Sequence, residues 1–382
     1  MKPIYSGFDG LEFAVQVTIP LSLADALAAI KANAQEFDSS LLLEMGGVWL
    51  TVNKNGVSGG YAYSCTEDTT GNWFFKKPSL RDPWGVRFSA ASSAIAILGI
   101  EGLRLRCAEV LDALGINAPV ESYSPSRVDF AIDFLAPEFA VVPDKFVIHS
   151  RAGLKSIDLI EDMQINGRSN RTTSVTVGKM PNRQAIIYDK REEVIVKRKH
   201  EWPAIWGRAM NGPDAPPLDI SDSNTSRVWR VELRVAKRHL KDVWDINSWA
   251  SLYELLQRVF MKMLDDINYC QPCTDTNRSR WRNHAIWTAV RDTVANDLFT
   301  DIPTLSPEEY VEIKKDQKID ELTIQALGLA ISVAAIQGCT ADNFDDFVER
   351  FCCTLEDKST DPHRPLHERL IKAHDKYRYL VS

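Results

Sequence analysis

Apolar and polar residues alternate along several segments before residue 240, and a period of two residues is typical of β-strands with one buried face. The segment 127–133 shows this pattern clearly, because three apolar residues alternate there with charged ones. Its polar positions include Asp129 and Asp133. The segment is therefore predicted to be a half-buried strand that presents two carboxylates on one face.

A second alternating segment, 228–235, presents charged groups of both signs. Arg230, Glu232 and Arg234 share one face, and four apolar side chains occupy the other. Carboxylates suit hard divalent cations, and guanidinium groups match phosphate oxygens. The two strands together predict a site where metal and phosphate chemistry meet.

A third segment delivers a tyrosine into a charged cluster. Residues 185–187 are apolar and lead to Tyr188, which charged residues follow. In a continuing strand, Lys190 would share a face with Tyr188, where its ammonium group would hold a phosphate or stabilise a phenolate. A phenol with a pKa of about 10 needs such help to act as a nucleophile. The alternative is an edge-strand tyrosine beside solvated charges.

Turn and helix signals place further elements around these strands. The expected elements are a strand at 11–19, a helix from Ser22 to Ala34, strands at 48–52, 60–64 and 86–89, a helix at 99–115, a hairpin formed by 174–179 and 184–189, and a helix at 192–200. The segment 143–150 fits either a short helix or a strand. The polar stretch 165–173 predicts a loop, and the Gly- and Pro-rich stretch 206–226 predicts a long irregular one.

After about Asp245 the apolar residues recur at helical spacing, as in 249–260 and 281–290. Ser306 and Glu309 form a capping-box pattern at the start of another helix. The chain is therefore predicted to be α+β, with an antiparallel-sheet domain at 1–245 followed by an α-helical domain at 246–382.

Composition fits an ordinary globular protein, with 382 residues, 45% apolar, 25% charged and a net charge of −7. Residues 121–240 depart from this balance, because they hold 19 Lys and Arg against 16 Asp and Glu. The N-terminus has no signal-peptide pattern and no apolar run looks long enough to span a bilayer, so a cytoplasmic location is expected. The seven cysteines predict no disulfide framework, and the single pair Cys270 and Cys273 is given no role.

Taken in order, the motifs resemble the replication initiation factor family. This family includes rolling-circle plasmid initiators of the Rep_trans type, RstA-like replication proteins of filamentous phages, and MobT-type relaxases. The matching segments are Ser126–Asp133, Tyr188-Asp189-Lys190 with Glu193, and Trp229–Arg234. The resemblance covers roughly residues 8–240. The chain shows no His-hydrophobic-His pair, which fits a family whose metal site looks to be carried mainly by carboxylates.

The resemblance implies an enzyme that nicks and rejoins one DNA strand at an origin through a 5′-phosphotyrosine intermediate. It implies a site with Mg²⁺ or Mn²⁺ held by Asp129, Asp133 and Glu232, with Tyr188 as nucleophile, and with Lys190, Glu193, Arg230 and Arg234 in catalytic roles. In that role the two arginines and the lysine would neutralise developing charge. Glu193 would orient the lysine or assist proton transfer.

The implied partners are single-stranded or extruded origin DNA and, through the C-terminal helices, host replication proteins, with no membrane. The polar stretch 165–173 is either a solvated connection or a mobile loop near DNA. The chain is expected to act as a monomer or a dimer. Two alternatives remain: a conjugative relaxase with the same chemistry, and a non-catalytic DNA-binding protein on the same fold.

Overall fold

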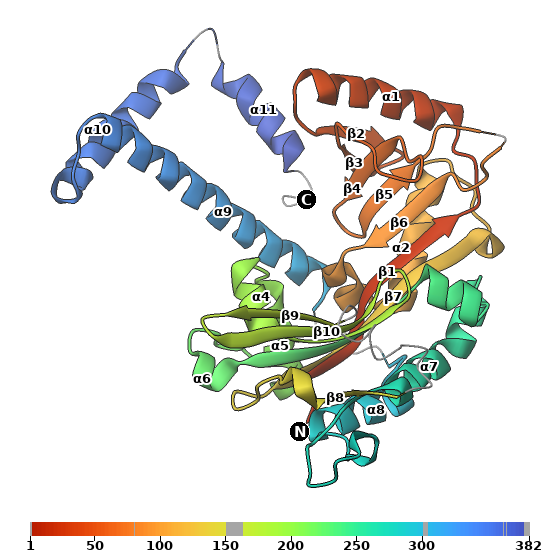
Figure 1. Cartoon of the computed structure of the whole chain (residues 1–382). Helices are drawn as coiled ribbons and strands as arrows, with labels where there is room; N and C mark the ends of the chain where they lie inside the picture. The colour runs from red at the N-terminus through yellow and green to blue at the C-terminus, as the bar shows by residue number, and fades with distance from the viewer. Residues whose placement is uncertain are drawn as a thin grey trace. The chain divides into compact units, whose positions relative to one another are not determined.

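An eleven-stranded antiparallel sheet organises the computed structural model of the chain (Figure 1). The structure describes residues 2–79, 81–149, 163–300, 305–361, 363 and 365–377. The strands lie in the order β2-β3-β4-β5-β6-β1-β7-β12-β11-β10-β9. Helices pack on the sheet and follow it at the C-terminal end, so the predicted α+β class is confirmed.

The bounds of the elements show how much of the chain this sheet uses. The strands are β1 Tyr5–Val15, β2 Leu41–Met45, β3 Val48–Val52, β4 Tyr63–Glu67, β5 Gly71–Phe75, β6 Val86–Ala90, β7 Tyr123–Leu135, β8 Phe146–Ile148, β9 Met163–Arg168, β10 Arg171–Lys179, β11 Arg183–Asp189, β12 Val228–Ala236 and β13 Ile267–Tyr269. The helices are α1 Leu21–Glu36, α2 Ser92–Ala113, α4 Lys190–Val196, α5 Glu201–Asn211, α6 Ser223–Ser226, α7 Trp249–Asp266, α8 Ala285–Asp297, α9 Pro307–Ile336, α10 Phe344–Ser359 and α11 Leu366–Lys376. Strands β8 and β13 form a separate pair.

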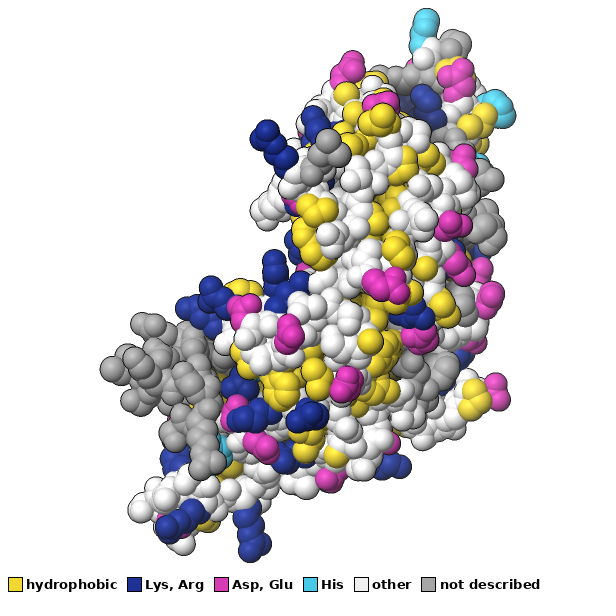
Figure 2. Space-filling view, turned by 90° about the vertical axis from the view of Figure 1, so that its right-hand side faces the viewer, with side chains coloured by type: hydrophobic (Ala, Val, Ile, Leu, Met, Phe, Trp, Pro, Cys, Tyr) yellow, Lys and Arg dark blue, Asp and Glu magenta, His cyan; other side chains and the backbone are white. Residues whose placement is uncertain are grey.

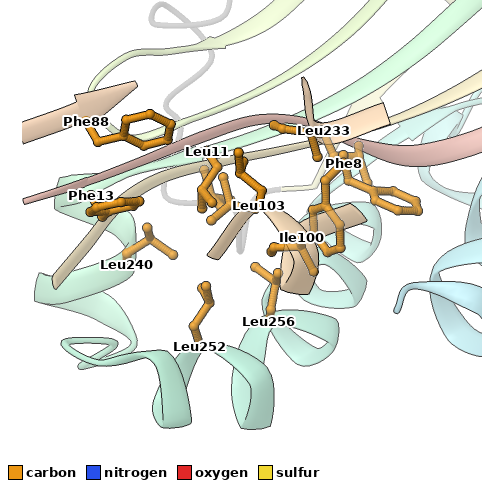
Figure 3. Packing of buried hydrophobic residues seen from close by; sticks show 14 of the residues in the cluster. Phe8, Leu11, Phe13, Phe88, Ile100, Leu103, Leu233, Leu240, Leu252 and Leu256 are labelled. Atoms are coloured by element: carbon orange, nitrogen blue, oxygen red, sulfur yellow. The ribbon is translucent and has the colours of Figure 1, made fainter. Parts of the chain in front are cut away.

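One face of the sheet is apolar and is covered by α2, α7 and α8. The alternation in β7 and β12 puts Phe130 and Leu233 directly opposite each other on this face. Leu252 and Leu256 of α7 belong to the same core cluster and point into it from the helix layer (Figure 3). Because burying each large side chain contributes roughly 1.5–3 kcal/mol, this layer holds the central strands firmly in register.

Residues 249–298 belong to the same core as the sheet. The ring of Trp249 lies 5.7 Å from that of Phe13 in β1, and Trp287 is fully buried beside Phe146 of β8. The chain accordingly divides into two compact units, Met1–Leu305 and Ser306–Ser382. This division falls later than the boundary expected after residue 245, because helical periodicity alone does not tell which core a helix joins.

Several element predictions near the tyrosine were wrong. The polar stretch at 165–173 forms a hairpin of β9 and β10, and its turn uses Ser169 and Asn170 at φ values of 51° and 60°. Helix α5 extends into the stretch expected to be irregular from 206 onward. Strand β11 ends at Asp189, whose side chain accepts a hydrogen bond from the backbone N–H of Glu192 and caps α4. Helix formation therefore begins at Lys190, two residues before the predicted start.

Helix α2 begins at Ser92, earlier than predicted, and is interrupted at Gly99. The backbone there has φ of 66° and ψ of 173°, which is not helical. A positive φ of this kind suits glycine, since a side chain would add strain. The glycine therefore marks a break inside the element and not its start.

The second unit contains α9, α10 and α11. Helix α9 is long and apolar enough to cross a membrane by length and composition alone, which the sequence analysis did not expect. Its qualifying stretch has a mean hydropathy of 1.6, and 6% of it is buried. Two acidic residues, Asp320 and Glu321, lie near the start of its apolar part and mask this character in the sequence.

Charges of both signs share the surface of the protein. On the face drawn in Figure 2, Lys and Arg side chains are interspersed with Asp and Glu, and apolar side chains gather in separate patches. This distribution fits the net charge of −7. A site for phosphate in this chain must therefore be local and built from particular side chains.

Candidate active site

Strand register assembles the candidate site on the polar face of the central strands. Tyr188 of β11 is directly opposite Arg230 of β12, and Arg230 is opposite Asp133 of β7. Asp133 is in turn opposite Tyr5 of β1. Residues opposite one another in an antiparallel pair point to the same face, so these four side chains form one row.

The two neighbouring rows bring in the remaining predicted residues. Glu232 lies opposite Ile186 and Ala131, and Arg234 lies opposite Asp129. Each row is two residues from the next along its strand, so all of them share a face. Asp129 and Glu232 thus lie on the same face of the sheet.

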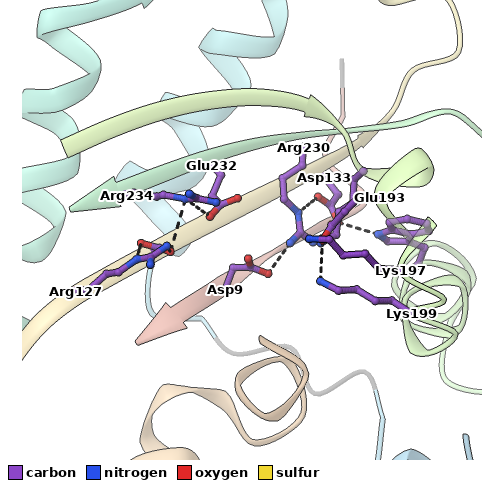
Figure 4. Close-up of polar contacts among 12 residues, drawn as sticks. Asp9, Arg127, Asp133, Glu193, Lys197, Lys199, Arg230, Glu232 and Arg234 are labelled. Atoms are coloured by element: carbon purple, nitrogen blue, oxygen red, sulfur yellow. Dashed lines mark hydrogen bonds and ion pairs between the residues drawn. The ribbon is translucent and has the colours of Figure 1, made fainter. Parts of the chain in front are cut away.

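Two arginines hold the carboxylates of this pair (Figure 4). Arg234 Nε lies 2.6 Å from Glu232 Oε1 and 3.7 Å from Asp129 Oδ2. Arg127 donates to both oxygens of Asp129, at 3.0 and 2.5 Å. Among the described residues, Glu232 Oε2 is buried with no hydrogen-bond partner. The pair therefore keeps one acceptor oxygen unused.

The pKa of Asp129 is raised to about 7. Burial is the main cause, and the nearby charge of Glu232 adds to it, while Arg127 and Arg234 act in the opposite direction. Two adjacent carboxylates in a buried site repel each other, so a cation is the partner that would relieve them.

A β-bulge in β1 makes room beside Asp129. The register shifts between Phe8 and Gly10, and a Cβ atom at Gly10 would lie 2.6 Å from Asp129 Oδ2. The bulge also turns Asp9 toward the site, where its Oδ1 lies 2.5 Å from Arg230 Nη1. Because a bulge changes the strand alternation, the sequence alone does not tell which face Asp9 occupies.

Asp133 is engaged on both of its oxygens. Arg230 donates from Nε to Oδ1 at 2.6 Å and from Nη2 to Oδ2 at 2.8 Å, and Trp206 Nε1 donates to Oδ2 at 2.8 Å. The carboxylate and the guanidinium are both fully buried. Of the three predicted metal ligands, Asp129 and Glu232 share Arg234 as a partner, whereas Asp133 is held by Arg230 and Trp206. Within the described ranges, no group of three His, Cys, Asp or Glu side chains is placed to hold a metal ion.

The Tyr188 side chain is partly exposed, and its hydroxyl has no hydrogen-bond partner in the described part of the chain. Its pKa is raised well above the usual value, first by burial and then by the charge of Glu232, while Arg230 lowers it. The phenol therefore stays protonated in the resting site. It needs a change in the charge around it before it can attack.

Lys190 lies beside the tyrosine although it is in a helix and not in the strand. Its Nζ is 5.8 Å from the centre of the Tyr188 ring and 4.6 Å from that of Trp202. Glu193 accepts from Lys190 at 2.5 Å and also from Lys197 and Lys199. The first turn of α4 thus supplies the neighbour that the sequence analysis assigned to strand alternation.

Comparison with known proteins leaves the family open. No family model matches the chain, and no curated protein matches it. The chain is similar to a solved structure of a rolling circle replication initiator protein from Geobacillus stearothermophilus, with 12% sequence identity and a TM-score of 0.41. The similarity covers 78% of this chain and 98% of that one. A TM-score this low does not carry a functional assignment, which therefore rests on the site.

Proposed function

We propose that the chain is a DNA strand transferase that nicks and rejoins one strand through Tyr188. The observation that carries the proposal is the pairing of a partly exposed tyrosine, whose hydroxyl has no partner among the described residues, with two mutually repelling carboxylates on the same face. A tyrosine beside a cation-binding pair is suited to covalent attack on phosphorus.

Asp129 and Glu232 would hold a divalent cation, Mg²⁺ or Mn²⁺. The unused Oε2 of Glu232 and the raised pKa of Asp129 both fit a bound cation. When bound, the cation supplies Lewis-acid polarisation of the scissile phosphodiester. Asp133 is not in this set, because it is fully buried against Arg230 and does not share Arg234 with the other two carboxylates.

The reaction at the tyrosine exchanges one phosphoester bond for another. The Tyr188 oxygen forms a bond to phosphorus as the bond to the 3′ oxygen breaks. The phenolic proton leaves to water, and the 3′ oxygen takes up a proton to become a hydroxyl group. Because the number of phosphoester bonds is unchanged, resealing by the reverse steps needs no nucleotide.

The basic residues would have different roles, because some would contact the phosphate and others would hold neighbouring side chains in place. Arg234 is partly exposed beside the carboxylate pair and would neutralise charge that develops on the phosphate oxygens. Arg230 is fully buried and would act as a positioning residue for the row that contains Tyr188. Lys190, held by Glu193, places a cation beside the phenol.

The biological role that fits this chemistry is initiation of rolling-circle replication in the cytoplasm, on single-stranded or extruded origin DNA. This choice rests on the motif resemblance, since a conjugative relaxase would use the same residues. The C-terminal helices would contact host replication proteins.

Trapping of the covalent intermediate tests the proposal. Supercoiled DNA of the element that encodes the chain is incubated with the protein and Mn²⁺, and peptide mapping locates any nucleotide adduct. We expect an adduct on Tyr188 that disappears with EDTA. An adduct on another residue, or nicking that leaves no adduct, would refute the mechanism.

A further inference from the structure

A basic pocket is lined in part by residues of α4 other than Lys190 and Glu193. It has a volume of about 430 Å³ and is lined by Arg168, Arg171, Arg191 and Arg227, together with Ile195 and Val196. Two carboxylates, Asp189 and Glu192, also line it. None of these side chains belongs to the candidate active site described above.

The pocket has more positive than negative charge. Arg171 forms ion pairs with both carboxylates, at 2.7 Å to Asp189 and 2.8 Å to Glu192. Arg168 forms a third ion pair, at 3.3 Å to Glu192. Four guanidinium groups thus share two carboxylates among the described lining residues. Such an excess attracts an anion, and guanidinium groups match phosphate oxygens in pairs.

Two of the arginines are oriented by neutral oxygens. Arg191 donates from Nε to Ser226 Oγ at 3.1 Å and from Nη2 to the Ile220 carbonyl at 2.5 Å. Arg227 donates to the Pro137 carbonyl at 3.1 Å and forms a long ion pair with Asp189 at 3.8 Å. Because neutral oxygens do not cancel the charge of a guanidinium group, the pocket wall is positive and already ordered.

An apolar lip completes the pocket. Ile195 and Val196 are 44% and 64% exposed, although both are aliphatic. A ligand that joins a phosphate to an apolar ring would match both the arginines and this lip. A nucleotide unit has that composition, and the pocket volume falls in the range of about 300–1,000 Å³ that is usual for small-ligand sites.

We infer that this pocket holds a phosphate and its nucleoside in single-stranded DNA next to the nucleotide attacked by Tyr188. Asp189 of the pocket directly follows Tyr188, and α4 turns Lys190 toward the tyrosine and Val196 toward the pocket. One short helix therefore separates the two places. The choice of DNA as the ligand rests on the proposed function.

A binding measurement with a matched pair of arginine variants tests the inference. Fluorescence anisotropy of a labelled ten-nucleotide single strand is measured on the full chain in EDTA, so that no cleavage intervenes. Arg168→Ala should weaken binding roughly tenfold, since a charge-assisted contact to phosphate is lost. The slope of log affinity against log salt should fall by about 0.7.

Arg280→Ala is the control for charge and exposure. The side chains of Arg168 and Arg280 are 70% and 72% exposed, and each forms one long ion pair, at 3.3 and 3.7 Å. Both variants remove one positive charge. We expect Arg280→Ala to bind within twofold of the parent chain, and equal effects of the two variants would overturn the inference.

A second pair tests the apolar lip. Val196→Glu places a carboxylate beside the arginines. Val243→Glu is the control, because it places a carboxylate at a valine that is similarly exposed, at 63%, but lies outside the pocket. The first should weaken binding at least tenfold and the second should leave it nearly unchanged. Unfolding midpoints of all four variants show whether a loss of binding follows from a loss of folding. Full binding by folded Val196→Glu would contradict the lip's role.

Competition separates a DNA strand from a free nucleotide as the source of the phosphate. Inorganic phosphate and a deoxynucleoside monophosphate should displace the labelled strand only at concentrations far above that of an unlabelled ten-mer. A mononucleotide that competes as well as the ten-mer would instead identify a free-nucleotide pocket and overturn the inference.

Failure of the pocket and failure of the nicking proposal give different results. If no adduct forms on Tyr188 but Arg168→Ala still weakens binding selectively, DNA binding by the pocket is supported and the nicking proposal is refuted. If the adduct forms but the pocket variants bind and react like the parent chain, the pocket inference falls.

Discussion

Arg230 holds Asp133 through two hydrogen bonds, at 2.6 and 2.8 Å, and both side chains are fully buried. The two residues are opposite each other on β12 and β7, so the pair also fixes the register of these strands. A buried ion pair that loses one member leaves an uncompensated charge. The pair therefore belongs to the framework that positions Tyr188.

Arg230→Ala should destabilise the protein by about 3–5 kcal/mol, because Asp133 and Asp9 would lose their partner in a buried site. Arg234→Ala should cost less, since that side chain is 29% exposed and its site can be hydrated. Denaturant unfolding followed in parallel with nicking measures both effects. Arg234→Ala should lose activity while it keeps most of its stability, and the reverse pattern would exchange the roles of the two arginines.

Tyr188→Phe should abolish nicking and covalent linkage while DNA binding remains within about twofold, since the hydroxyl has no partner in the described structure to lose. The change removes one oxygen, so the unfolding free energy should shift by less than about 1 kcal/mol. Gel assays of nicking and anisotropy of a single strand give the two readouts. Tyr63→Phe is the control, because Tyr63 is a buried tyrosine in the core cluster on β4. A covalent adduct that persists in Tyr188→Phe would rule out this nucleophile.

A divalent cation should stabilise the folded chain against heat through Asp129 and Glu232. With Mn²⁺ at 100 times its dissociation constant, linkage gives about 2.7 kcal/mol. Asp129→Asn and Glu232→Gln should each lose most of this increase, whereas Glu12→Gln should keep it. Calorimetric melting with and without Mn²⁺ measures the effect. An unchanged response in both site variants would place the cation elsewhere.

His239 should make stability fall as the solution is acidified. Its Nε2 accepts from Trp244 Nε1 at 3.2 Å and its Nδ1 lies 3.1 Å from Asn182 Oδ1, so the ring is held neutral. Burial, together with the charge of Arg183, lowers its pKa to about 4. The unfolded chain, with a pKa near 6.5, binds a proton that the folded chain resists, so stability is lost as pH falls from about 6.5 to 4.

By pH 4 this linkage amounts to roughly 3 kcal/mol, at about 1.4 kcal/mol for each unit of pKa shift. In His239→Gln the decline of unfolding free energy between pH 6.5 and 4 should be shallower. Denaturant titrations at several pH values compare the two chains. If the unfolding free energies of the two chains fell in parallel with pH, the histidine would bind a proton as readily in the folded state as in the unfolded one.

A chain that ends at Leu305 should fold and keep its nicking activity, because residues 1–305 form one compact unit. A chain that ends at Asp245 should not fold, since it loses the buried α7 side chains Trp249, Leu252 and Leu256. At roughly 1.5–3 kcal/mol for each, the burial of these and the other apolar residues of α7 is as large as the 5–15 kcal/mol that stabilises a typical domain. Circular dichroism and proteolysis distinguish the two chains. A folded, inactive chain at Leu305 would assign the second unit a part in cleavage.

Strand alternation was sufficient to predict where three of the candidate residues lie in the sheet. The period-two patterns around Asp129, Tyr188 and Glu232 placed all three on strands of one sheet, and the register put them on one face. These features follow from local sequence, because a strand that buries one face must alternate. The polar stretch 165–173, which forms most of β9 and the start of β10, lacks that alternation, so it looked like a loop.

Contacts between distant segments were not predictable in the same way. The hydrogen bond from Trp206 to Asp133 joins residues that are 73 positions apart in the sequence. The Gly and Pro residues that follow the tryptophan had predicted an irregular loop there. The face that Asp9 occupies could not be predicted, because it depends on a bulge in β1. Whether α7 joins the sheet or the second unit depends on which apolar surfaces meet. Sequence periodicity gives the buried side of a helix but not its partner.

The position of β12 between β7 and β11 has a consequence for the newly made protein. Both neighbours leave the ribosome before β12, and β12 is complete only at Ala236. At roughly 5–20 residues per second, a nascent chain therefore carries Tyr188 for several seconds without Arg230 or Glu232 beside it. During that interval the tyrosine lacks the side chains that lie beside it in the folded sheet. If the proposed mechanism holds, synthesis that stops before Ala236 yields fragments that do not cut DNA.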